Sequence, residues 1–257
     1  MSRTADLLIE IGCEDLPARY VLPLAQALTE AIAEGLDRAG VVRGAATPYA
    51  TPRRIAVAIA AVADRQVDQD MERRGPAVAV AFKDDQPTAA AQGFARSCGV
   101  EVRALKRENG HLVFRKRQKG RRTVELLPEL FEAALKTMDT LVPKRMRWGD
   151  GEETFVRPVQ WLAALWGGRV VPLQRFGLAA GRRTFGHRFH APRAISLKTP
   201  ADYASALKAA HVWADFATRR AEIRHQIERQ AAAVGGHARI TDRLLDEVTA
   251  LVEWPVA

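Results

Sequence analysis

The first sixty residues alternate between strand-like and helix-like patterns, and this order most constrains the fold. The apolar run Leu7–Gly12 ends at a glycine, which predicts a strand. Apolar residues then recur at helical spacing from Val21 to Leu36, and Gly40 is a stop signal. Ile55–Ala60 alternates large and small apolar residues, which indicates a second, half-buried strand. The chain therefore opens as strand, helix, strand, and a mixed α+β fold is predicted.

Three carboxylates surround the predicted turn between the first strand and the first helix: Glu10, Glu14 and Asp15. Such a group of carboxylates could hold a metal ion or accept hydrogen bonds from a ligand amine. A structural interpretation is favoured, in which Asp15 caps the helix and Glu14 lies near its positive end. Pro17 would then occupy the first turn, where its missing N–H costs least.

The middle of the chain has the pattern of an inserted module. The polar segment 64–76 ends in Arg73-Arg74-Gly75-Pro76, which is a turn signal. Thr88–Cys98 is Ala-rich and predicts a helix, His111–Arg115 predicts a strand, and Val124–Met138 predicts a second helix. These patterns favour a helix–hairpin–helix insert at about residues 64–142.

The last quarter of the chain changes to an all-helical pattern. Phe155–Trp166 is apolar and could be helix or strand, and Val170–Leu173 predicts a further strand. After a soft boundary near Pro200, three segments have helical patterns: Asp202–Leu207, Phe216–Val234 and Asp242–Val252. The second carries Arg219 and five further charged residues, which predicts a solvated face. We therefore expect a mixed module over 1–200 and a helical segment over 201–257, whose apolar end predicts further chain.

The charge of the chain suggests a polyanionic partner. The 257 residues carry a net charge of +9, and clustered cations favour phosphate backbones. A GC-rich genome would also favour Arg over Lys, so the positions of the charges, rather than their number, must decide whether a nucleic acid is the partner. Cys13 and Cys98 are far apart and form no CxxC pair, which predicts reduced thiols. With neither a leader sequence nor a membrane-span pattern, we expect a cytoplasmic chain without a membrane partner.

Arginines cluster at three places, with proline in a turn at the first and with glycine and aromatic residues at the other two. They are Thr51-Pro52-Arg53-Arg54, the segment Lys144–Gly149, and Gly181–Phe189. Guanidinium groups bind phosphates in a forked geometry, and aromatic faces stack on bases. In the second segment, the alternative is that Met146 and Trp148 enter the core while the cations reach solvent.

No pattern for catalysis or cofactor binding accompanies these arginines. His187 and His190 have i, i+3 spacing, but no third ligand lies nearby in sequence for a zinc ion. No GxSxG elbow, GxGxxG turn or GxxxxGK[ST] loop is present. We therefore predict no catalytic residue, no metal site and no cofactor in this chain.

The motifs together resemble the beta subunit of bacterial glycyl-tRNA synthetase, in the order of that family and along essentially the whole chain. The resemblance begins with Ile9-Glu10-Ile11-Gly12-x-Glu14-x-Leu16-Pro17, which has Cys13 and Asp15 where Thr and Glu are common. The other matching motifs are Thr51–Arg54, Arg73–Pro76, Lys144-x-Met146–Gly149, Phe155–Pro158, Gly186–Phe189 and Leu251–Val256.

The resemblance implies a role in charging tRNA-Gly with glycine. The family enzyme is an alpha2beta2 heterotetramer, whose alpha chain binds ATP and magnesium and makes glycyl-adenylate. The beta chain is implied to support tRNA binding, and it extends into HD-like and anticodon-binding domains beyond residue 257. The N-terminal part is similar to the B3/B4 module of the phenylalanyl-tRNA synthetase beta chain, which edits mischarged tRNA.

Three hypotheses follow for the function of this part. The first is tRNA contact together with assembly on the alpha subunit. The second is a scaffold that docks the alpha subunit without touching RNA, with its arginines buried in ion pairs. The third is an editing hydrolase, which rests on fold analogy alone. For the first, the predicted RNA contacts are Arg53, Arg54, Arg145, Arg147, Trp148, Arg182, Arg183, Phe185, His187 and Arg188.

Overall fold

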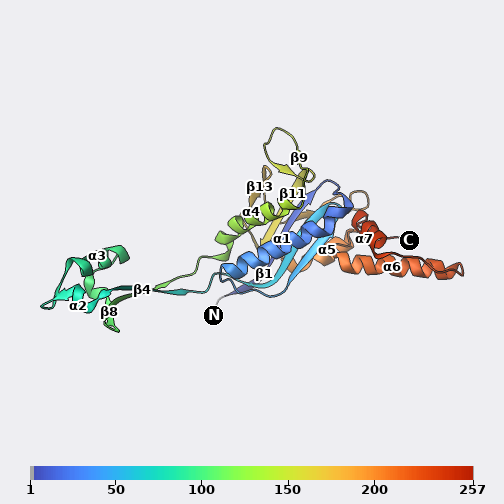
Figure 1. The fold of residues 1–257 in the computed structure, drawn as a ribbon. Helices are drawn as coiled ribbons and strands as arrows, with labels where there is room; N and C mark the ends of the chain where they lie inside the picture. Colours follow the sequence, from blue (N-terminus) through green and yellow to red (C-terminus); the bar gives the residue numbers. More distant parts are fainter. Residues whose placement is uncertain (1–2, 257) are drawn as a thin grey trace. The chain divides into compact units, whose positions relative to one another are not determined.

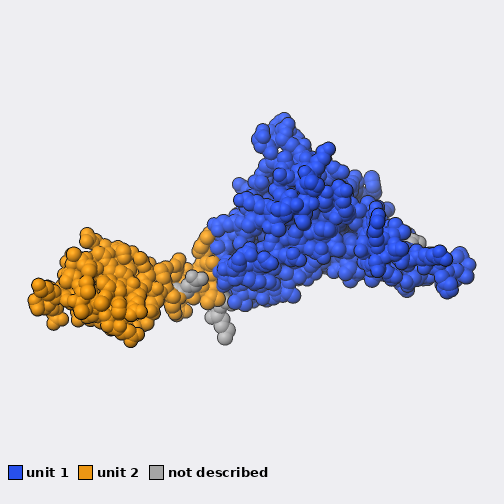
Figure 2. All heavy atoms as spheres, viewed as in Figure 1, with its two compact units in different colours: residues 1–65, 122–257 blue, residues 66–121 orange. Residues whose placement is uncertain are grey.

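The computed structural model describes residues 3–256 and divides the chain into two compact units (Figures 1 and 2). The first unit combines the described residues of 1–65 with those of 122–257, and the second consists of residues 66–121. The inserted unit is thus shorter than the expected 64–142. No helix of the described residues is long and apolar enough to span a membrane.

A five-stranded antiparallel sheet forms the centre of the first unit, in the order β12-β11-β1-β3-β2. The strand bounds are β1 Thr4–Cys13, β2 Ala46–Thr51, β3 Arg54–Ala63, β11 Val159–Trp166 and β12 Arg169–Val170. Both strands predicted in the first sixty residues are confirmed, and β1 lies in the middle of the sheet. The segment that could have been helix or strand is β11 over most of its length, because its residues pair with β1 from Leu7↔Trp166 to Cys13↔Val159.

Both faces of this sheet are buried, which explains why β1 is a nearly continuous apolar run. Leu7, Ile9 and Ile11 belong to the larger core, which helices α1 (Ala18–Arg38) and α4 (Thr123–Thr140) complete. Leu8 belongs to a second core on the opposite face, which includes Tyr203 and Leu207 of α5 (Tyr203–Ala209). The alternation of β1 therefore divides its apolar side chains between two layers.

Two local predictions in this unit are wrong. Asp15 does not cap α1: Pro17 is the N-cap residue of that helix, and no side chain caps it. Helix α4 was assigned to the insert from the sequence, but it packs on α1 in the first unit. Its apolar stripe, which includes Leu127, Phe131 and Leu135, completes the larger core, and this explains the placement.

Short hairpins and three helices complete the first unit. The hairpins pair β9 Met146–Arg147 with β10 Thr154–Phe155, β13 Gln174–Arg175 with β14 Leu178–Ala179, and β15 Arg183–Phe185 with β16 Ala194–Ser196. The turn η2 (Pro200–Asp202) leads into α5, and α6 (Phe216–Ala233) and α7 (Asp242–Leu251) follow. All three predicted C-terminal helices are confirmed. The strand expected at Val170–Leu173 is confirmed only at its first residue, in β12.

The second unit has a small core of its own, made of Ala81, Ala91, Ala95, Leu105, Leu112 and Phe114. Its elements are β4 Gln69–Ala77, α2 Val78–Ala81, β5 Phe82–Lys83, β6 Gln86–Pro87, α3 Ala89–Cys98, η1 Val102–Ala104, β7 Lys106–Glu108 and β8 His111–Gln118. The predicted helix and strand are present as α3 and β8. The turn expected at Arg73–Pro76 is instead part of β4, where Arg73 pairs with Phe114 and Arg74 with Val113.

A substitution at Gly12 tests the packing of the central sheet. A Cβ atom at this position would lie 1.8 Å from the Trp161 ring of the neighbouring strand. We expect Gly12→Ala to lower the free energy of unfolding by about 1–3 kcal/mol. Urea unfolding followed by tryptophan fluorescence measures this, because all five tryptophans lie in the first unit. Gly151→Ala is the control, since a Cβ there meets nothing within 4 Å; equal stability of the two variants would contradict the packing.

Candidate nucleic-acid interface

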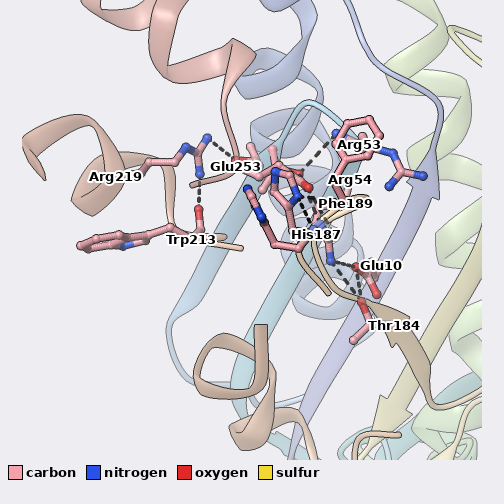
Figure 3. Close-up of polar contacts among 12 residues, drawn as sticks. Glu10, Arg53, Arg54, Thr184, His187, Phe189, Trp213, Arg219 and Glu253 are labelled. Atoms are coloured by element: carbon pink, nitrogen blue, oxygen red, sulfur yellow. Dashed lines mark hydrogen bonds and ion pairs between the residues drawn. The ribbon is translucent and has the colours of Figure 1, made fainter. Parts of the chain in front are cut away.

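A buried ionic cluster connects the sheet to the C-terminal segment of the chain (Figure 3). Arg54, at the start of β3, is fully buried. Its Nη1 lies 3.3 Å from Glu10 Oε1 on β1, and its Nη2 lies 3.2 Å from Glu253 Oε1 after α7. The Arg54 guanidinium therefore pairs with Glu10, 44 positions before it in the sequence, and with Glu253, 199 positions after it.

Hydroxyl groups complete the coordination of the two carboxylates. Thr184 of β15 and Tyr203 of α5 donate to Glu10 Oε1 at 2.8 and 3.1 Å. Thr51 of β2 donates to Glu253 Oε1 at 2.7 Å. We call Glu10, Thr51, Arg54, Thr184, Tyr203 and Glu253 the Arg54 cluster. Because Arg54 is enclosed in this cluster, its guanidinium is not accessible to RNA in this structure, and the contact predicted for it is wrong.

A second buried arginine fixes the helices that follow. Arg219 of α6 is fully buried and donates to the backbone carbonyls of Ala50, Thr249 and Trp213. Burial lowers the pKa of this guanidinium to about 10. The solvated position expected for Arg219 is therefore wrong, although Arg220 on the same helix does pair with Asp242 and Asp246. The Arg219 contacts join the end of β2 to the segments that carry Trp213 and Glu253.

Beside these buried groups lies a row of neighbouring aromatic rings, which we call the aromatic strip. His187 lies 6.1 Å from Phe189 and 4.5 Å from His190 between ring centroids. The row continues from His190 to His211 at 5.6 Å. Its last members are Trp254, 5.2 Å from His211, and Trp213, 6.2 Å from Trp254. Phe189 is 79% exposed, and the rings of His190 and His211 are also in exposed residues, so the strip offers rings to solvent.

The loop between β15 and β16 holds its part of the strip by local hydrogen bonds. The backbone N–H groups of Phe189 and His190 donate to Nδ1 of His187, at 3.2 and 3.3 Å. Burial lowers the pKa of His187; Glu253 opposes this shift, and the neighbouring His190, His211 and Arg53 add to it. A neutral imidazole is required here, because Nδ1 acts as an acceptor.

Arg53 and Arg188 lie together in two adjoining pockets at one end of the strip. The first pocket has a volume of 270 Å³, and Trp161 and Phe185 form its aromatic wall. The second, of 280 Å³, is lined by His187, Phe189 and Trp254. Both arginines line both pockets. Arg188 is neutralised by Glu14 and Asp15, at 2.5 and 3.2 Å.

Arg53, unlike Arg188, forms no ion pair in the described part of the chain. No ion pair joins Arg53 to a carboxylate within the described residues 3–256, and its Nε is buried without a hydrogen-bond partner. Its guanidinium carbon lies 5.8 Å from the centroid of the Trp161 ring. Arg53 extends away from the Arg54 cluster, while the next residue points into it (Figure 3). Arg53 is therefore a cation available to an anionic ligand.

The other predicted contacts have different surroundings. Arg182 donates to the carbonyls of Leu197 and Gly168, both at 3.1 Å. Phe185 packs on Trp161 with centroids 4.9 Å apart. Arg183 is exposed, and none of its side-chain contacts to residues 3–256 is a hydrogen bond or an ion pair. Arg182 thus has a structural role, whereas Arg183 remains free to bind phosphate.

The segment around Trp148 does not join this surface. Arg145 pairs with Asp139, and Arg147 donates to the carbonyl of Gly151 at 3.1 Å. The Trp148 ring is partly buried and lies 6.0 Å from Phe176. None of these three predicted residues lines either of the two pockets.

Sequence reasoning missed the part of the strip contributed by His211, Trp213 and Trp254. These rings come from segments about 40 residues apart in sequence, and only the fold brings them together. Lys208, also missed, lies 4.0 Å from the Trp213 centroid as a cation–π partner. Within the part of the chain that the structure describes, no three His, Cys, Asp or Glu side chains are grouped to hold a metal ion.

Removal of Arg54 tests the importance of the buried cluster. We expect Arg54→Met to lower the free energy of unfolding by about 3–5 kcal/mol, because two carboxylates would be left buried without their cation. Urea unfolding measures the change, and the exposed Arg183→Met is the matched control. A loss below about 1 kcal/mol, or one equal to that of the control, would contradict this role of the cluster.

The pH dependence of stability tests the state of Glu10. Burial raises the pKa of Glu10 from 4.5, while Arg54 and the hydroxyl donors oppose the shift. The Glu10 carboxyl therefore stays protonated to a higher pH in the folded chain than in the unfolded chain. Because of this difference, the contribution of Glu10 to the free energy of unfolding falls as pH rises above 4.5. We expect wild type to lose stability relative to Glu10→Gln over this range. Urea unfolding at a series of pH values checks this; a difference that grows in favour of wild type would refute it.

Comparisons with known proteins agree with the resemblance seen in the motifs. The family profile described as "Glycyl-tRNA synthetase beta subunit" matches residues 7–257. The glycine–tRNA ligase beta subunits of Chromohalobacter salexigens and Marinobacter nauticus are 51% and 46% identical over 98% of this chain. That of Acidithiobacillus ferrooxidans is 45% identical over the whole chain. The chain spans 37% of the length of these relatives. It belongs to the family of glycyl-tRNA synthetase beta subunits.

Proposed function

We propose that this chain is the N-terminal part of a beta subunit that supports the attachment of glycine to tRNA-Gly in the cytoplasm. The overall reaction converts ATP, glycine and tRNA-Gly into glycyl-tRNA, AMP and diphosphate. In this proposal the alpha subunit binds ATP and magnesium and carries out the chemistry, within an alpha2beta2 assembly. The chain itself contributes tRNA contacts and a surface for assembly.

The aromatic strip and its flanking cations are the observation that supports RNA contact. Arg53 lies at one end and Lys208 at the other, next to Trp213. Exposed rings beside cations are what a single nucleic-acid strand requires, because bases stack on the rings while phosphates bind the cations. Arg183 adds a further exposed cation in β15.

A scaffold without RNA contact is the second candidate, and the other arginines support it. Arg54 pairs with carboxylates inside the core, Arg188 pairs with Glu14 and Asp15, and Arg182 binds backbone carbonyls. These three guanidiniums hold the fold together. Under this alternative, the aromatic strip would be a docking surface for the alpha subunit.

Filter binding of tRNA-Gly over a salt series separates the two candidates. We expect the affinity of the chain to fall linearly with salt on logarithmic axes, with a slope of roughly −0.7 to −0.9 per phosphate contact. Replacing both Arg53 and Lys208 by Ala should reduce that slope by about 1–2. Arg96→Ala, an exposed cation of the second unit, is the control and should not change it. Absence of salt-dependent binding would leave the scaffold as the better account.

A further inference from the structure

The two pockets beside Arg53 have the form of a site for two consecutive bases. They share Arg53 and Arg188, and each also has aromatic side chains of its own. Trp161 and Phe185 form one wall, and His187, Phe189 and Trp254 form the other. The two pockets thus share a cation and each offers aromatic rings, which suits one phosphate with a base on either side.

The size and the charge of the site agree with this arrangement. At 270 and 280 Å³, each pocket is close to the lower limit of about 300 Å³ for small-molecule sites, so each suits a single base. Arg188 is paired with Glu14 and Asp15, whereas no ion pair joins Arg53 to a carboxylate of the described residues. One guanidinium without a carboxylate partner can bind one phosphodiester.

We propose that this groove binds one dinucleotide step of unpaired RNA, with the linking phosphate on Arg53 and one base in each pocket. The proposal rests on the RNA contact proposed above and specifies its ligand as single-stranded. Paired bases would not enter the pockets, because their edges and faces are occupied inside a duplex. Arg188 has a positioning role, since it lines both pockets and its two ion pairs hold it in place.

Gly186 explains how the loop that carries Phe189 is held. A Cβ at this position would lie 2.3 Å from the carbonyl oxygen of Ala191 and 2.9 Å from Ala210. The loop from Gly186 to Ala191 therefore folds tightly against the segment after α5, where the His187 N–H donates to the Ala210 carbonyl at 3.0 Å. This leaves Phe189 projecting from the loop with 79% of its surface exposed.

Competition between two small ligands tests the proposal directly. A fluorescently labelled ten-nucleotide oligoadenylate is bound to the chain, and unlabelled ApA or AMP is added. AMP carries more negative charge, whereas ApA has two bases on one phosphodiester. We expect ApA to displace the probe at a concentration at least about 5-fold lower than AMP, since each stacked base strengthens binding by about that factor or more. Stronger competition by AMP would overturn the two-base site.

Variants locate the site and keep the test independent of folding. We expect Phe189→Leu and Phe185→Leu each to weaken oligoadenylate binding by about 5-fold or more, because the substituents stay apolar but lose their ring faces. Arg53→Ala should weaken it and remove about one phosphate from the salt dependence. Phe94→Leu in the second unit is the control. Unchanged binding by both ring variants would overturn the proposal.

The outcome is separable from that of the proposed function. If tRNA-Gly binds with salt dependence but oligoadenylate does not compete with it, whereas the duplex of oligoadenylate with oligouridylate does, RNA contact stands and the unpaired dinucleotide site fails. If neither tRNA-Gly nor oligoadenylate binds, the proposed RNA contact itself fails.

Discussion

The Arg54 cluster is the interaction on which the arrangement of the first unit depends. Removing one guanidinium and two carboxylates from water is costly, and only close pairing and additional hydrogen bonds offset that cost. Arg54, Glu10 and Glu253 achieve this with hydroxyl donors from β2, β15 and α5. The pairing fixes where the segment after α7 meets the sheet, because Glu253 can satisfy Arg54 only from that position.

The same contacts determine which side chains reach the surface. Arg53 lies in the turn before β3 and Arg54 is the first residue of that strand, and their side chains take different directions, Arg53 away from the cluster and Arg54 into it (Figure 3). Glu253 lies buried while the next residue, Trp254, joins the aromatic strip. The backbone N–H of Trp213 donates to the backbone carbonyl of Glu253 at 2.8 Å, which connects the residue that carries a second ring to the cluster. A buried ionic network thus positions a surface of rings and cations.

Periodic apolar patterns predicted the elements of this chain better than its site. Strands β1 and β3 and helices α3, α6 and α7 follow from local spacing, which packing then preserves. The burial of Arg54 and Arg219 could not be predicted, since a charged side chain ordinarily favours solvent and their partners lie up to 199 residues away. The aromatic strip was missed for the same reason: its rings meet only after the chain has folded.

Hydrogen–deuterium exchange of the chain with Glu253→Gln tests most directly whether the Arg54 cluster positions this surface. The substitution keeps the shape of the side chain but removes the charge that Arg54 faces. We predict faster exchange in peptides covering residues 210–216 and 249–256, with no change in α3 of the second unit. Unchanged protection of the Trp213 amide and of residues 249–256 would contradict the account.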